Sequence, residues 1–179
     1  MRILLAAIVI CAASIIPAVA EAETSTLEEG FAEIRRSPPN AQVQEAILGK
    51  LADVKARYAA AKGNDLLRDD IAKEGSAALC ALAKKVTAAI GWTGTLERVE
   101  GDRSNVTITI RIGDGFHVWT IASKPDPVIG AVATMVPGTR VRFNALIELS
   151  GEMCDTKNTF GERSSIRTVV MFESIELVR

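Results

Sequence analysis

The sequence predicts an α+β fold in which an N-terminal helical hairpin precedes a five-stranded β-barrel. Two observations predict this arrangement. From Asn40 to Ile90 the chain is rich in alanine and its large apolar residues recur at steps of three and four, which is typical of helices that pack through one face. From Gly91 onward β-branched residues dominate and the apolar period falls to two, the period of strands with one buried face.

Residues 1–20 have the three parts of a signal peptide. Arg2 supplies a positive charge, an apolar stretch of about 14 residues follows, and a small-x-small motif ends at Ala20. This stretch is shorter than the roughly 20 apolar residues of a membrane-spanning helix. We therefore expect cleavage after Ala20 and an exported mature chain, either periplasmic or secreted into the medium, with no membrane span.

Residues 21–39 join the signal peptide to the helical hairpin. Their pattern fits a short helix that ends before Ser37-Pro38-Pro39, because proline and its preceding residue disfavour helix. The same stretch would also serve as a loose tether. Both interpretations stay open on the sequence alone.

Residues 40–90 predict the helical hairpin. Gly63 suits the left-handed position after a helix, and Asn64 suits the cap of the next one. Gly75 is a weak point in the second helix, because glycine is a poor helix former. The apolar stripes consist of Val43, Ile47, Leu51, Val54 and Tyr58 in the first helix and of Leu67, Ile71, Leu79, Leu82, Val86 and Ile90 in the second.

Residues 91–179 predict the barrel. Gly113-Asp114-Gly115 is a hairpin signal between the second and third strands. The apolar register slips near Glu173-Ser174, which predicts a β-bulge. A helical turn is expected over residues 128–135, in the long connection before the fourth strand. We expect strands over residues 92–100, 105–112, 116–121, 138–149 and 165–178. Three meandering strands, a long connection and two more strands form the order of an OB-fold, a five-stranded Greek-key barrel.

Two short motifs resemble segments of exported bacterial OB-fold-like proteins of poorly defined function. Trp92-Thr93-Gly94-Thr95-Leu96 is similar to their W-x-G-x-V/L segment, and residues 138–145 are similar to their G-x-x-V-x-F-x-G/A segment. The resemblance covers residues 91–178 and implies a barrel that binds a ligand or a partner, often without catalysis.

The charges are almost balanced, with 21 Lys and Arg against 22 Asp and Glu. Proteins that bind phosphate backbones do so mainly through accumulated basic residues, so this balance argues against a general nucleic-acid binder. A local basic patch remains compatible with it.

Two cysteines, Cys80 and Cys154, remain once the signal peptide is removed. In an oxidising compartment they have one intramolecular pairing, and we expect a disulfide between them. The alternative is a pair of unpaired thiols. Their separation differs from the C-x-x-C spacing of redox catalysts.

His117 is the only histidine, so a catalytic triad, a histidine-ligated zinc site or a Cys-His pair would all require it. The sequence contains no nucleophile elbow, no H-E-x-x-H motif and no Walker phosphate loop. We therefore expect no catalytic activity, no metal site and no cofactor.

One surface of the barrel is a candidate binding site. Strand alternation points Val106, Ile108, Ile110, Val118, Val141, Phe143 and Ile147 inward. The candidate ligand-binding residues point outward from the second, third and fourth strands, and they are Arg111, His117, Trp119, Arg142 and Asn144. Such side chains suit an anionic chain or a sugar ring, and OB-folds commonly bind ligands on this face. The alternative is an ordinary polar outer face.

Together these features predict an exported, soluble, non-enzymatic binding or interaction module. Its ligand would be a protein, a peptide or a glycan of the cell envelope. Two alternatives belong to other classes: an OB-fold protein that binds nucleic acid through the same face, and a hydrolase that uses His117.

Overall fold

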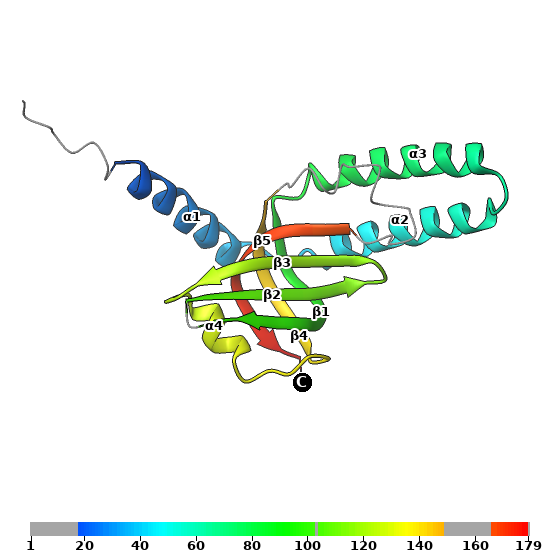
Figure 1. The fold of residues 1–179 in the computed structure, drawn as a ribbon. Helices are drawn as coiled ribbons and strands as arrows, with labels where there is room; N and C mark the ends of the chain where they lie inside the picture. Colours follow the sequence, from blue (N-terminus) through cyan, green and yellow to red (C-terminus); the bar gives the residue numbers. More distant parts are fainter. Residues whose placement is uncertain (1–17, 103, 149–165, 179) are drawn as a thin grey trace, which may run out of the picture.

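The computed structural model describes residues 18–102, 104–148 and 166–178, and in these ranges three helices precede a closed barrel (Figure 1). The helices are α1 (Ala18–Arg36), α2 (Ala41–Ala60) and α3 (Asp65–Ala83). The barrel elements are β1 (Ala88–Gly101), β2 (Asn105–Gly113), β3 (Phe116–Ser123), α4 (Pro127–Val132), β4 (Arg140–Ile147) and β5 (Ile166–Leu177).

The strands close in the order β1-β2-β3-β5-β4. All neighbouring strands are antiparallel except β3 and β5, which are parallel. A helix, α4, lies in the connection between β3 and β4. This confirms the predicted α+β class, with a helical hairpin followed by a five-stranded barrel of OB-fold topology.

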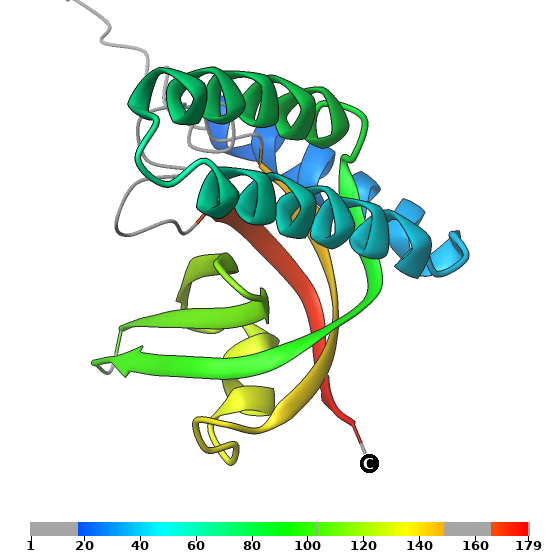
Figure 2. The ribbon, with the colours of Figure 1, turned by 90° about the vertical axis from the view of Figure 1, so that its right-hand side faces the viewer.

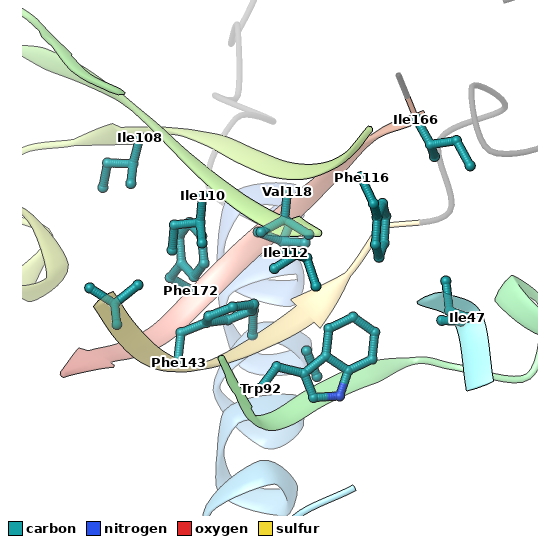
Figure 3. Packing of buried hydrophobic residues seen from close by; sticks show 14 of the residues in the cluster. Ile47, Trp92, Ile108, Ile110, Ile112, Phe116, Val118, Phe143, Ile166 and Phe172 are labelled. Carbon is teal, nitrogen blue, oxygen red and sulfur yellow. The ribbon is translucent and has the colours of Figure 1, made fainter. Parts of the chain in front are cut away.

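Aromatic rings fill the centre of the barrel (Figure 3). Trp92 is fully buried and meets Phe116 and Phe143 edge to face, with ring centroids 6.4 and 6.5 Å apart. Phe143 meets Phe172 in the same way at 5.4 Å. The predicted inward set is buried with the exception of Ile147, which is half-buried at the end of β4. Strand alternation therefore identified the core side of the barrel.

The helical hairpin of α2 and α3 projects from one end of the barrel (Figure 2). Gly63 adopts a left-handed conformation with φ of 87°, and the Asn64 side chain accepts a hydrogen bond from the backbone N–H of Leu67 at 3.1 Å. Both turn roles are as predicted. Leu67 itself is 46% exposed, so its place on the buried stripe was wrong. It lies in the first turn of α3, at the tip of the hairpin.

Gly75 is a point of close packing between the two helices. It is buried on α3, and an added Cβ would collide with the side chain of Val54 on α2. The glycine therefore lets the two helix backbones approach each other, a role that its low helix propensity did not indicate.

The boundary between helix and strand lies earlier than the sequence predicted. α3 ends at Ala83 and β1 begins at Ala88, where Ala88 and Ala89 pair with Leu146 and Ala145 of β4. The expected continuation of the second helix to Ile90 was wrong. Alanine carries little intrinsic preference for a strand, so the pairing with β4 decides its conformation.

Residues 21–39 form most of α1 and not a loose tether. α1 begins at Ala18 and runs past the expected cleavage position, while residues 1–17 lie outside the described ranges. Gly30 lies against the side chain of Leu146, and the Arg35 guanidinium binds Glu173 of β5 at 3.4 Å. The C-terminal half of α1 is thus docked on the barrel.

The predicted bulge in β5 is confirmed. Asn144 of β4 pairs with Ser174 and Ala145 pairs with Phe172, so Glu173 is the extra residue on β5. A bulge turns a side chain out of the regular alternation. Here it brings the Glu173 carboxylate, whose side chain is 14% exposed, toward Arg35 of α1.

Two polar side chains at the start of α2 connect the helices to β1. Asn40 accepts hydrogen bonds from the Ile90 N–H and the Trp92 indole N–H at 2.9 and 2.7 Å. Gln44 donates to the Thr93 carbonyl at 2.6 Å and accepts from the Thr93 N–H at 3.1 Å. The side-chain amides of Asn40 and Gln44 take the place of a strand partner that β1 lacks here. The main-chain groups of Ile90 and Thr93 therefore keep their hydrogen bonds.

Within the described ranges, no helix has the length and apolar character needed to cross a membrane.

Candidate functional site

The outer face of β2 and β3 carries three of the candidate binding residues. Figure 1 shows these strands at the front of the barrel with no helix drawn across them. In register, His117 of β3 lies between Arg111 of β2 and Arg167 of β5. Because neighbouring strands are about 4.8 Å apart, the two arginine backbones are about 10 Å apart. We call Arg111, His117 and Arg167 the arginine row.

Neither arginine of this row has a counter-ion among the described residues. Arg111 and Arg167 are exposed, and neither makes an ion pair or a hydrogen bond within the part of the chain that the structure describes. A guanidinium presents a planar fork of donors that matches a carboxylate. The row therefore has unused capacity to bind an anion.

His117 is half-buried between the two arginines. Its Nε2 lies 3.3 Å from Oε2 of Glu97, whereas its Nδ1 is buried and has no hydrogen-bond partner among the described residues. Burial lowers the pKa of His117, and Arg167 and Arg111 lower it further against the opposing effect of Glu97. The imidazole is thus neutral at pH 7, and the carboxylate of Glu97 favours the tautomer with the proton on Nε2.

Trp119 follows two residues along β3 and lies on the same face as His117. It is half-buried and is paired in register with Thr109 and Val169. Its indole Nε1 is buried without a hydrogen-bond partner in the described ranges. Two neighbouring outward side chains of β3, His117 and Trp119, thus lie beside two arginines that have no ion pair among the described residues.

The structure places the other two candidates elsewhere. Arg142 and Asn144 lie on β4, which is separated from the β2–β3 face by β1 on one side and by β5 on the other. Arg142 is exposed there. Asn144 accepts a hydrogen bond from the Gly91 N–H at 2.8 Å and donates to Glu173 at 3.5 Å, so it stabilises the barrel wall.

The sequence did not reveal two residues of this site. Glu97 sits at a register shift between Leu96 and Arg98, where alternation cannot tell which way a side chain points. Arg167 reaches the site through the parallel pairing of β5 with β3. The OB-fold strand order, which brings the last strand beside the third, was the one signal that could have found it.

Metal chemistry and the cysteines add no further residue to the site. Among the described residues there is no cluster of three His, Cys, Asp or Glu side chains suited to a metal ion. Cys80 is half-buried near the end of α3, and Cys154 lies outside the described ranges.

The fold and the site define an α+β protein with a closed barrel, a projecting helical hairpin and an outer face that combines arginine with tryptophan. Comparison of this chain with protein-family models, with curated proteins and with solved structures finds no match.

Proposed function

We propose that this protein is an exported, non-enzymatic binding module whose arginine row and Trp119 bind an anionic glycan of the cell envelope. The observation that carries the proposal is the pair of exposed arginines on either side of His117, neither of which has a counter-ion among the described residues. Two exposed like charges about 10 Å apart repel each other weakly, and an anionic ligand bound between them would remove this repulsion.

The chemistry of the neighbouring groups favours an acidic sugar. Its carboxylate would accept hydrogen bonds from the guanidinium of Arg111 or Arg167. The sugar ring would lie against the half-buried indole of Trp119. Export, expected from residues 1–20, would bring the protein to such glycans.

A titration followed by two-dimensional NMR tests this proposal. The probe is tetragalacturonic acid, and a neutral tetrasaccharide of glucose serves as the control ligand. We expect the indole signal of Trp119 to shift saturably with the acidic probe, while the fully buried Trp92 stays unchanged. If neither signal moves with the acidic probe, the proposed glycan site is refuted.

Charge-matched variants locate the site. The double variant Arg111→Ala/Arg167→Ala removes both guanidiniums of the row, and we expect affinity to fall by about tenfold or more, since charge-assisted hydrogen bonds contribute about 1.5–3 kcal/mol. Arg140→Ala/Arg142→Ala removes two exposed arginines of β4, outside the arginine row, and serves as the charge-matched control. Equal losses in both proteins would mean that the attraction is general and not local.

Nucleic acid is the second candidate ligand for this face. Exposed arginines beside a tryptophan are typical of single-strand binders, whereas the overall balance of 21 basic against 22 acidic residues disfavours a long phosphate backbone. A short oligonucleotide distinguishes the two ligands. Affinity for it would fall steeply with salt, while weak or salt-independent binding removes this alternative.

A hydrolase that uses His117 in a Ser-His or Cys-His pair would need a hydroxyl or a thiol beside the imidazole. The hydrogen-bond partner of His117 in the described part of the chain is the carboxylate of Glu97, which is not the hydroxyl or thiol that such chemistry requires. No observation favours this alternative over binding. Any hydrolytic activity that survives in His117→Ala would be independent of this residue.

We also propose that Cys80 and Cys154 form a disulfide in the exported protein. The support is their sequence context, with two cysteines in a chain expected to enter an oxidising compartment. Thiol labelling of the unfolded, non-reduced mature protein tests it. No reactive thiol is expected, and two reactive thiols per chain would exclude the bond.

A further inference from the structure

β3 loses one of its two neighbouring strands before it ends. It pairs with β2 as far as Ser123, whereas its pairing with β5 ends at Trp119 and Val169. β5 then continues along β4 to Leu177. Figure 1 shows β5 turning down behind β2 and β3 while β3 runs on to the left. On the β5 side, residues 120–123 of β3 therefore have no paired strand among the described residues, and we call this unpaired side the gap.

Two hydrogen bonds show which main-chain groups point into this gap. The Lys124 N–H donates to the Ser104 carbonyl on the β2 side at 3.1 Å, and the Gly115 carbonyl accepts from the Ile166 N–H on the β5 side at 2.7 Å. Main-chain groups of successive strand residues point to alternate sides. The N–H and C=O of Ile121 therefore point toward the gap, where no strand lies within the described ranges.

A groove of about 820 Å³ opens at the same edge, between α1, the end of β3, the start of α4 and β5. Its apolar side chains include Ile121, which is 58% exposed, and Met171, which is 37% exposed. Leu27 and Phe31 of α1 line it from the other side and are half-buried. A free strand edge beside apolar side chains is what strand addition by an extended peptide requires.

The charged side chains that line the groove favour basic peptides over acidic ones. Three carboxylates, those of Glu28, Asp126 and Glu173, line it together with one guanidinium, that of Arg35. Arg35 is already paired with Glu28 at 2.6 Å and with Glu173 at 3.4 Å. The net charge of these four side chains is negative. This favours a basic occupant and disfavours a second copy of this acidic edge.

We propose that this groove binds an extended segment of a partner protein with alternating apolar and basic side chains, which adds as a strand to residues 120–123 of β3. The peptide main chain would bond to the N–H and C=O of Ile121. Its apolar side chains would lie against Ile121 and Met171, and its basic side chains would meet Asp126 and the exposed carboxylate of Glu28. This site uses none of the residues of the arginine row and does not depend on the glycan proposal.

A nine-residue peptide of alternating valine and lysine is the probe, and its affinity is measured by fluorescence anisotropy. Hydrogen exchange then reports the main-chain contact directly. We expect the Ile121 amide to become protected when the peptide binds. A peptide of the same length with glutamate in place of lysine should bind more weakly, and a backbone N-methylated peptide should not bind, because it lacks the donors of a strand.

Variants at two exposed apolar positions complete the test. Ile121→Lys should weaken binding of the valine-lysine peptide by about tenfold or more, because it replaces an apolar contact with a like charge. Leu66→Lys, at an 82% exposed position at the hairpin tip, should leave binding unchanged. The double arginine variant Arg111→Ala/Arg167→Ala should also bind the peptide normally, which separates this site from the glycan site.

Three results would overturn the proposal. One is equal peptide affinity in the Ile121→Lys and Leu66→Lys proteins. Another is an Ile121 amide that exchanges equally fast with and without the peptide. The third is a concentration-dependent dimer that Ile121→Lys dissociates, since the occupant of the edge would then be a second copy and not a partner's segment.

Discussion

The side chain of Asn40 joins the helical segment to the barrel through three hydrogen bonds to β1. Its side chain donates to the Ala88 carbonyl at 2.9 Å and accepts from both Ile90 and the indole of Trp92. Trp92 has no exposed surface, so its indole N–H depends on this one oxygen. The central aromatic side chain of the barrel is thus oriented from outside the barrel.

We expect Asn40→Ala to lower the free energy of unfolding by about 2–3 kcal/mol, because buried donors that lose their partner retain their full desolvation cost. Urea unfolding followed by tryptophan fluorescence measures the effect. Asn105→Ala is the control, because the hydrogen bond of Asn105 with Ser123 lies on the exposed surface. Equal losses in the two variants would contradict the proposed role of Asn40.

The neutral state of His117 makes stability depend on pH. Its pKa in the folded protein lies below the usual value of about 6.5, chiefly through burial. As the pH falls, His117 is therefore protonated at a higher pH in the unfolded chain than in the folded protein. The contribution of His117 to stability is complete above about pH 6.5 and is lost as the pH falls through the folded pKa.

Comparison of wild type with His117→Gln measures this contribution. The difference between their free energies of unfolding should be constant above about pH 7. Below about pH 6.5 the wild type should lose stability relative to His117→Gln. NMR titration of the imidazole gives the folded pKa independently. A midpoint above 6.5, or a difference that does not vary with pH, would contradict the assignment.

At the scale of elements, the packing of α2 against α3 depends on a glycine. Gly75 is buried against Val54, whereas Gly49 lies on the exposed face of α2 with no atom near the position of an added Cβ. The two residues thus share a helical backbone and differ in their surroundings.

The same substitution should therefore have opposite effects at these two sites. Gly49→Ala should raise the free energy of unfolding by up to about 1 kcal/mol through helix propensity. Gly75→Ala should lower it by about 1–2 kcal/mol, because overpacking outweighs that gain. Thermal and urea unfolding of both variants measure the difference, and stabilisation by both would show that the hairpin helices can move apart without cost.

At the scale of the whole molecule, the proposed disulfide would join the helical hairpin to the segment between β4 and β5, which lies outside the described ranges. On the chain-entropy estimate, a bond between Cys80 and Cys154 contributes about 4 kcal/mol, less any native strain. We expect Cys80→Ser to lose about 2–4 kcal/mol under oxidising conditions. In reducing buffer the variant and the wild type should unfold alike, and a persistent difference there would mean that Cys80 acts through packing.

The sequence by itself determined the elements of this protein. Period-two alternation identified the inward residues of the barrel, the helical period identified the hairpin, and the slip at Glu173 identified the bulge, because each is a local property of residues close together in the chain. It also grouped Arg111, His117 and Trp119, whose strands are joined by a tight turn.

The tertiary structure decided what depends on contacts between distant segments. The parallel pairing of β5 with β3 brings Arg167 to His117, and its early end opens the groove beside Ile121. The start of β1 at Ala88, the approach of Val54 to Gly75 and the bonds of Asn40 are likewise set by neighbours far away in sequence. Local periodicity shows which face of a strand is buried, but the strands beside it are set by the closure of the barrel.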